Sequence, residues 1–531
     1  MKKELLLRTL ITIVIGSILY YFILPPINIS SPDFWIFVFI IVLLFMGSSI
    51  IGLLNVREKI IQFGKHPKKS FLVPMIVIGV FAFILVINLF NTPVFNAKGY
   101  AQRIKINENG NFNDDIKEVD FNALPLLDKD SSQKLGDRVM GQMPELVSQF
   151  SVSDLYTQIN YKNDIVRVTP LEYASIIKYF TNQKEGIKGY ITVNSVTGEA
   201  KLTKLKKGMK YVPSALFNDN LYRKLRFSHP TEIFDTAQFE LDNEGNPYWI
   251  VPTVKYAGVG LKKEITGIVA LDPITGKSTK YRLKDVPKWV DHVYSPELIM
   301  DQIDDWGQYK KGFLNSIFGQ KDVVLSTSGY NYTVMNDDVY LYTGITSAAA
   351  DQATIGFVMC NLRTKETKFY AVPGAEEQSA MASAEGQVQQ MKYNSTFPLL
   401  INLNGKPTYL VSLKDNAGLV KMYGFVDVAD YQKVVVSDAS KGIEAAANNY
   451  LGDDKVHDED SLKTKEITLD TIKNVVIDGN TYYYMTDKDG KKYKASIKVN
   501  TDVLPYIQAG DTITIRYKTE KDVTELIGLS K

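Results

Sequence analysis

The chain has 531 residues, 45% of them apolar and 23% charged, so it is long enough for several domains with buried cores. Its formal net charge of +2 gives no overall positive field of the kind that nucleic-acid-binding proteins use. The single cysteine, Cys360, excludes an internal disulfide, and its apolar surroundings (GFVMCN) favour a buried structural thiol over a reactive one.

Three apolar runs open the chain, from Leu5 to Leu24, from Phe34 to Leu54 and from Phe71 to Phe90. Each is about 20 residues long, enough for a helix to cross a bilayer. Basic residues flank the N-terminal side of the first run and return between the second and third, whereas the link PPINISSPD has none. The positive-inside rule therefore predicts a multi-pass cell-membrane protein with a cytoplasmic N-terminus and residues 91–531 outside. We expect a three-helix membrane anchor over residues 1–90 and an extracytoplasmic stem over residues 91–150.

A hairpin motif then recurs along the chain. The clearest copy is EITGIVALDPITGKSTKYRL (264–283), an apolar strand, a turn at Asp272–Gly276 and a second strand. Related copies begin at Gly189, Gly356 and Gly424, and the last of these lacks the Thr-Gly pair. The last three copies each follow an earlier strand pair, and the copies are unequally spaced. The pattern predicts related modules with variable loops over residues 151–451.

Helical stretches are expected between the strand groups, at 171–181, 296–309, 379–391 and 442–450, which gives an α+β class of repeated hairpin-plus-helix modules. Residues 452–462 (GDDKVHDEDSL) are acidic and without an apolar run, and are predicted to be a linker. Residues 463–531 contain five or six strand patterns, which favour a small β-barrel of the OB type, with a two-sheet sandwich as the alternative.

The phrases GIVALDPITGK and GYITVNSVTGE resemble the PepSY-type module, an α+β unit of secreted and membrane proteins. Longer stretches are similar to an uncharacterised family of membrane-anchored proteins of Gram-positive bacteria, some of which carry a colicin-V-production-type label. These stretches are SSQKLGDRVMG (131–141), SDLYTQINYKNDIVRVTPLEYA (153–174), NPYWIVPTV (246–254), GFLNSIFGQKDV (312–323), NDDVYLYTGITS (336–347) and SAMASAEGQVQQ (379–390). The resemblance implies a cell-envelope protein with PepSY-like repeats, and it implies no activity and no catalytic residues.

Residues with catalytic or ligand-binding chemistry are few and scattered. The four histidines, His66, His229, His292 and His457, have no metal-ligand spacing, and no nucleophile elbow, P-loop or dinucleotide fingerprint occurs. We therefore expect no catalytic residues, no metal and no cofactor. The weak binding candidates are Asp301 and Asp305, one helical turn apart, Glu385 on a small-residue helix, and Tyr483 in the run Tyr482–Tyr484. The turn at 336–338 is a further weak Ca²⁺ candidate, and for each of these an ordinary structural role is favoured.

The leading hypothesis is a membrane-anchored, non-catalytic binding or scaffold protein of the cell envelope. Its partners would be the lipid bilayer and an envelope polymer or partner proteins, not nucleic acid, and homo-oligomerisation stays open. A cell-envelope hydrolase or transferase working through carboxylates is the alternative. Transport is disfavoured because the second and third apolar runs carry no charge.

Overall fold

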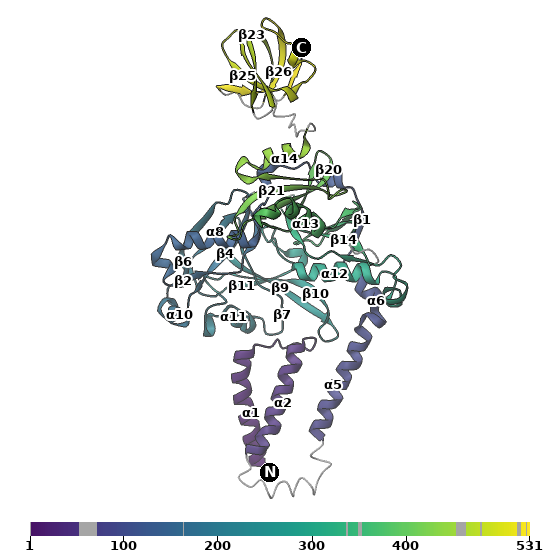
Figure 1. The fold of residues 1–531 in the computed structure, drawn as a ribbon. Coiled ribbons are helices and arrows are strands. Elements are labelled where there is room, and N and C mark those ends of the chain that lie inside the picture. Colours follow the sequence, from purple (N-terminus) through teal and green to yellow (C-terminus); the bar gives the residue numbers. More distant parts are fainter. Residues whose placement is uncertain are drawn as a thin grey trace. The chain divides into compact units, whose positions relative to one another are not determined.

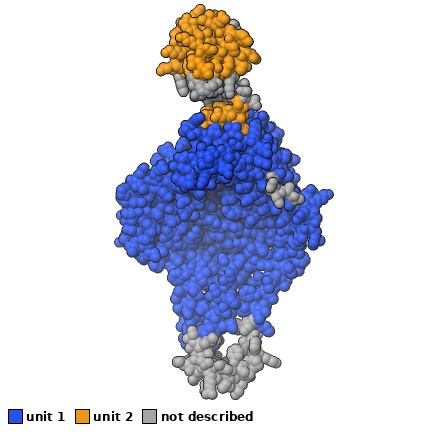
Figure 2. Space-filling model, in the orientation of Figure 1, with its two compact units in different colours: residues 1–441 blue, residues 442–531 orange. Residues whose placement is uncertain are grey.

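The structure is a computed structural model that describes residues 2–51, 72–162, 164–335, 338–348, 353–452, 463–477, 480–517, 522–526 and 528–530. It is α+β and divides into two compact units, residues 1–441 and 442–531 (Figure 2). Most of the acidic segment expected as a linker, and the turn positions 336 and 337, lie outside the described residues.

The apolar N-terminal segments form helices α1 (Lys2–Ile23), α2 (Pro32–Ile51) and α5 (Leu72–Asn91), and α6 (Pro93–Ala101) follows α5. Among the described residues one helix, Leu6–Ile23, is long and apolar enough to cross a membrane, or two if α5 and α6, bent by 50° at their junction, count as one span. The apolar part of α2, Pro32–Ser48, is shorter. The prediction of three spans is therefore wrong. Pro93 starts a new helix where the third apolar run ends. The basic loop between the second and third runs, from which the membrane orientation was predicted, lies outside the described residues.

Residues 150–438 form four sheets whose core strands pair in chain order and antiparallel. These cores are β3-β4-β5-β6, β8-β9-β10-β11, β13-β14-β15-β16 and β19-β20-β21-β22 (Figure 1). In each sheet one short strand also pairs with the second core strand, and these short strands are β2, β7, β12 and β18. One helix precedes each sheet in the chain, and these helices are α8, α11, α12 and α13. We call each helix and its sheet a module.

The bounds of the modules are as follows. Module 1 contains α8 (Lys129–Gly141), β2 (Phe150–Val152), β3 (Thr157–Tyr161), β4 (Asp164–Tyr173), β5 (Ile187–Asn194) and β6 (Ala200–Met209). Module 2 contains α11 (Leu221–Ser228), β7 (Ile233–Phe234), β8 (Gln238–Leu241), β9 (Pro247–Ala257), β10 (Leu261–Leu271) and β11 (Ser278–Arg282). Module 3 contains α12 (Pro296–Tyr309), β12 (Val324–Ser326), β13 (Asn331–Met335), β14 (Asp338–Ser347), β15 (Ala353–Asn361) and β16 (Thr367–Tyr370). Module 4 contains α13 (Glu377–Gln387), β18 (Asn394–Ser395), β19 (Leu399–Leu403), β20 (Lys406–Lys414), β21 (Val420–Asp427) and β22 (Val434–Asp438).

Smaller elements complete this unit. Strands β1 (Ile106–Gly110) and β17 (Gly374–Ala375) extend the third sheet, and β1 pairs in parallel with β16. The short helices are α7 (Phe112–Asp115), α9 (Pro144–Val147) and α10 (Ile176–Asn182), with the single turns η2 (Phe217–Asp219) and η4 (Asn315–Gly319). Residues 91–150, expected as a stem, therefore contain α8, which packs against β5 and β6.

The same turn joins the last two core strands of every module. The side chain of its first residue accepts hydrogen bonds from the backbone N–H groups two and three positions later, and these residues are Asn194, Asp272, Asn361 and Asp427. Gly276 then takes a φ of +73°, a conformation that suits glycine. The recurring hairpin of the sequence is thus a structural turn.

The first three sheets pack face to face in chain order. One hydrophobic core lies between the first and second sheets and includes Ile159, Val193 and Trp249. A second core joins the other face of the second sheet to α12 and the third sheet, with Ile268, Ile303 and Leu341. The first core strands meet at the centre, because β3 lies against β8 and β14 and β13 lies against β19. Figure 1 shows the four sheets surrounding this centre.

The second unit contains α14 (Ile443–Leu451) and one six-stranded sheet in the order β27-β25-β24-β23-β26-β28. Its strands are β23 (Lys463–Ile477), β24 (Asn480–Asp487), β25 (Lys492–Ser496), β26 (Thr512–Tyr517), β27 (Val523–Glu525) and β28 (Gly528–Ser530). The end strands β27 and β28 do not pair with each other among the described residues, so the predicted closed barrel is wrong. The long strand β23 pairs with β26 through its first half and with β24 through its second, and the sheet ends on its two sides in the three-residue strands β28 and β27.

Candidate functional site

All four modules contribute walls to one cavity of about 580 Å³ at the centre of the first unit. We call it the central chamber and define it by Leu127, Gln158, Arg167, Gln238, Tyr332 and Leu410, which come from the loop before α8 and from β3, β4, β8, β13 and β20. Volumes of this size are typical of small-molecule sites.

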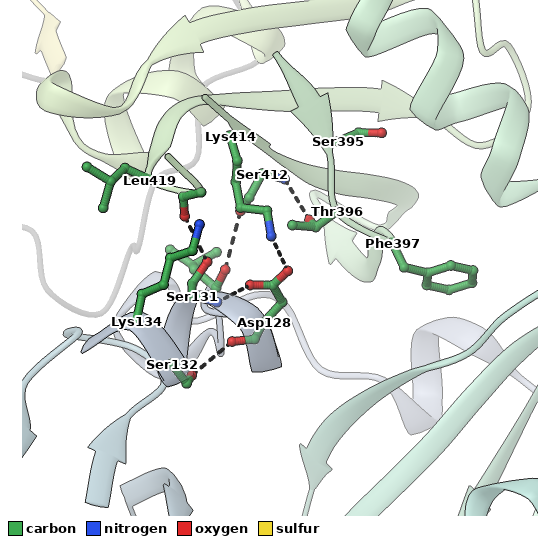
Figure 3. A network of polar contacts seen from close by, with 12 residues as sticks. Asp128, Ser131, Ser132, Lys134, Ser395, Thr396, Phe397, Ser412, Lys414 and Leu419 are labelled. Atoms are coloured by element: carbon green, nitrogen blue, oxygen red, sulfur yellow. Dashed lines mark hydrogen bonds and ion pairs between the residues drawn. The ribbon is translucent and has the colours of Figure 1, made fainter. Parts of the chain in front are cut away.

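Contacts between module 4 and module 1 close one side of the chamber (Figure 3). Lys414 on β20 forms an ion pair with Asp128, which caps α8 by accepting from the N–H of Ser131 at 3.0 Å. Ser412, also on β20, donates to the carbonyl of Leu126 at 3.4 Å. Burial alone would raise the pKa of Asp128, but the hydrogen bonds from Lys414 and Ser131 hold it below its usual value. The first and last modules are therefore directly joined.

Two buried hydrogen-bond donors without partners line the chamber side by side. Gln158 and Arg167 face each other across β3 and β4 and are 2% and 6% exposed. The Nε2 atom of Gln158 and the Nε atom of Arg167 have no hydrogen-bond partner, and no described carboxylate forms an ion pair with Arg167. Burial lowers the pKa of Arg167, because the charged guanidinium loses its water. Such a pair is unusual, since buried donors in proteins are almost always satisfied.

A hydrogen-bonded group of buried residues fixes the strand that carries Gln158. The His292 ring Nε2 lies 2.6 Å from the carbonyl oxygen of Gln158, so this nitrogen carries the proton. The carboxylate of Glu240 accepts from the backbone N–H groups of Asp291 and His292 at 2.9 and 3.0 Å. Burial lowers the pKa of His292 to about 4 and raises the pKa of Glu240 to about 7. His292 is therefore neutral at physiological pH and holds the backbone at Gln158 in place.

The remaining wall of the chamber mixes apolar and polar side chains. Leu155, Phe397, Leu399 and Leu410 are apolar, whereas the other lining residues include Lys129, Gln238, Glu297, Asn331 and Ser412. The hydroxyl of Tyr330 donates to Glu297 at 3.2 Å, at the start of α12. The apolar side chains of module 4 thus share the chamber with polar groups from the other modules.

The carboxylates proposed from the sequence lie elsewhere, and Asp305 and Glu385 already have protein partners. Asp301 is exposed on α12, whereas Asp305 forms an ion pair with Arg103, which also binds Glu264 at 3.2 Å. Burial raises the pKa of Asp305, and Arg103 opposes this rise. Glu385 accepts from the backbone and side chain of Ser395 at 2.8 and 2.6 Å, which ties α13 to β18.

Tyr483 is half-buried against the core of the second unit, while Lys494 lies over the rings of Tyr482 and Tyr484 on the opposite face. Cys360 is fully buried, and burial raises the pKa of its thiol to about 12. His66 and His457 lie outside the described residues, and His229 contacts the hydroxyl of Ser278 at 2.9 Å. In the part of the chain that the structure describes, no group of three or more His, Cys, Asp or Glu could hold a metal.

Sequence reasoning missed Arg167 and Gln158. The one signal was that Arg167 interrupts the apolar run IVRVTPL on a strand, where a charge must either face solvent or meet a buried partner. Only the three-dimensional packing of four modules distinguishes these cases.

The C-terminal end of α1 is held by α11. Arg223 donates to the carbonyl of Tyr21 at 3.1 Å and lies over its ring, and Arg226 donates to the carbonyl of Leu24 at 3.0 Å. These carbonyls have no partner within α1, and a positive charge is favourable at this end of a helix. These contacts fix the end of α1 to α11 of module 2.

Exposed apolar side chains continue from the end of α1 across α10, η2 and α11. We call this surface the apolar base, and it consists of Ile176, Ile177, Phe180, Phe217, Tyr222 and Phe227, which are 46–72% exposed. The ring of Phe227 lies 6.1 Å from Tyr20 on α1, and the ring of Phe180 lies 6.3 Å from Phe217. A patch of this kind on a soluble surface marks an interaction site.

Comparison with known proteins gives no assignment, because no family model and no curated protein matches the sequence.

Proposed function

We propose that this chain is a membrane-attached, non-catalytic binding protein of the cell envelope that receives its ligand in the central chamber. The observation that carries the proposal is the convergence of all four modules on one cavity of about 580 Å³. A repeat protein that needed only an extended scaffold surface could keep its modules in an open row. Here module 4 returns to module 1, and both line the same cavity.

Membrane attachment is supported by α1 and by the apolar base beside it. The segment Leu6–Ile23 is long and apolar enough to span a bilayer, and Lys2 and Lys3 precede it. Positive charge at that end favours a cytoplasmic N-terminus, with the first unit on the outer side. The apolar base, with its aromatic residues, then lies at the level where such side chains meet the lipid headgroups.

The alternative of a carboxylate-dependent hydrolase needs two carboxyl groups that face one cleft. Asp305 is engaged with Arg103 away from the chamber, and Asp301 is a solvent-exposed residue of α12. The carboxylates near the chamber are also engaged, Asp128 with Lys414 and Glu297 with Tyr330. No observation favours the hydrolase over binding.

Native mass spectrometry of the full chain in nanodiscs, prepared from its own membranes, tests the proposal. We expect a bound small molecule on the wild-type protein and its loss in Leu155→Trp, because the indole fills part of the chamber. Leu314→Trp is the matched control, since Leu314 is 70% exposed and outside the chamber. An absent adduct in the wild type, or equal retention in both variants, would contradict the proposal.

A further inference from the structure

We infer that the central chamber binds a small molecule that carries a carboxylate, and that Arg167 and Gln158 bind its carboxylate group. The inference rests on the proposed function, namely that the chamber is a ligand site, and adds the chemical class of the ligand.

The first argument is the type of group left without a partner. Gln158 and Arg167 are directly paired across antiparallel strands, so their side chains leave the same face of the sheet with Cβ atoms roughly 5 Å apart. Both unpartnered atoms, Nε2 of Gln158 and Nε of Arg167, are N–H donors. Two adjacent donors need an acceptor, and the fork of N–H groups on a guanidinium matches the two oxygens of a carboxylate.

The second argument comes from the other well-buried arginines of the described chain. Arg223 and Arg226, 9% and 6% exposed, donate to backbone carbonyls at the end of α1. Arg103, whose side chain is 6% exposed, pairs with Asp305 and Glu264. Arg167 is equally buried but has no such acceptor, although a buried cation without a counter-charge is strongly unfavourable. A protein keeps such a group where a ligand supplies the missing charge.

The third argument concerns the charge of the ligand. The carboxylates nearest to Arg167 are Asp128 and Asp130, and Asp128 is already neutralised by Lys414. Glu297 at the start of α12 adds a further negative charge to the lining. Lys129 adds a positive charge to the same lining, and a dianionic phosphate would meet more repulsion from Glu297 than a carboxylate would.

The fourth argument concerns the rest of the ligand. Beyond the polar pair the lining mixes apolar side chains, among them Phe397, Leu399 and Leu410 of module 4, with polar ones such as Gln238 and Ser412. An apolar part of the ligand against the module 4 side chains would displace water from surfaces that cannot hydrogen-bond to it. The expected orientation therefore places the carboxylate at β3 and β4 and any apolar part towards module 4.

The test measures ligand-induced thermal stabilisation of the full chain in detergent micelles. The probes are 4-phenylbutyrate, hexanoate and N-acetylphenylalanine, each compared with its neutral carboxamide, and phenyl phosphate serves as the dianion. We expect at least one carboxylate to bind at least tenfold more tightly than its amide and than phenyl phosphate. Arg167→Met should remove this preference, and Gln158→Leu should weaken carboxylate binding severalfold.

The melting temperature of ligand-free Arg167→Met separates a binding role from a structural one. Replacing an unpaired buried charge by a side chain of similar length should raise the melting temperature, whereas losing a structural contact should lower it. Binding of acids and amides with equal affinity, tighter binding of phenyl phosphate, or no binding of any carboxylate together with a lowered melting temperature would each overturn the inference. The proposed function fails separately, through the native mass spectra of Leu155→Trp.

Discussion

Lys414 on β20 and Asp128 at the start of α8 form an ion pair across 286 residues of sequence, and this pair joins the last module to the first (Figure 3). Both side chains are partly buried, so the pair is screened less than a surface ion pair. We expect Lys414→Met to destabilise the first unit by about 1.5–3 kcal/mol, the range for a hydrogen bond to a charged group. Hydrogen–deuterium exchange should increase around residues 128–141 and 408–420 and not in the second sheet.

Lys421 offers a matched control for that experiment. It lies 3.5 Å from Asp415 in an exposed pair of the same module. Lys421→Met should therefore cost less than about 1 kcal/mol. Equal effects of the two substitutions, or exchange that increases uniformly over the unit, would contradict a closing role for Lys414.

Substitutions of Asp305 and Asp301 test whether these carboxylates have a structural or a functional role. We expect Asp305→Asn to lower stability by about 1–3 kcal/mol, because it leaves the buried guanidinium of Arg103 with one partner fewer. Asp301→Asn should change stability by less than about 0.5 kcal/mol, since the side chain is exposed. Chemical unfolding of both variants tests this. If either variant abolished a cell-wall-degrading activity of the wild type, the hydrolase hypothesis would replace ours.

The apolar base can be located relative to the bilayer with single-cysteine labels. The natural Cys360 is fully buried and its raised pKa keeps it unreactive, so a cysteine introduced at position 177 is labelled alone. A spin label on Ile177→Cys in nanodiscs should be accessible to oxygen and protected from a water-soluble nickel complex. The control Leu419→Cys, on the exposed β20–β21 loop that contacts α8, should show the reverse. Identical accessibilities would exclude contact with lipid.

Glu240 predicts a specific pH dependence of stability. Burial raises its pKa from 4.5 to about 7 in the folded state, so the folded protein favours the protonated form. This preference contributes about 3 kcal/mol to the free energy of unfolding below pH 4.5. The contribution is lost as the pH rises to about 7. We expect the stability of the wild type relative to Glu240→Gln to fall between pH 5 and 8 in chemical unfolding. If the difference in stability between the wild type and Glu240→Gln stayed constant over this range, the pKa of Glu240 would not be raised by folding.

Local patterns in the sequence were enough to predict several elements. The turn at Asp272–Gly276 depends on a side chain that caps it from within the turn. The helix Pro296–Tyr309 depends on an apolar face that follows a proline at its start. The helix expected at 171–181 is half right, because β4 continues to Tyr173 and Ser175 caps α10 only afterwards.

Features that depend on distant contacts could not be predicted. Residues 129–141 were expected to belong to a stem, yet they form α8, and Gly136 lets this helix approach Tyr156 and Ile191. The chamber requires β3, β4 and β20 to meet, and residues 158 and 412 carry no mark of this in their local sequence. The mistaken barrel has the same origin, since strand patterns give the number of strands and not the partners of the long strand β23.

The link between residues 128 and 414 also has a consequence for how the protein is made. A row of independent repeats can fold one repeat at a time as the chain emerges, whereas here the cavity is complete only after the fourth sheet has formed and returned to a helix built much earlier. Under the proposed function, a shorter folding intermediate would therefore lack the ligand site. Removing a module would remove one wall of the chamber, so the number of modules would be fixed by the site and not free to vary as in an open repeat array.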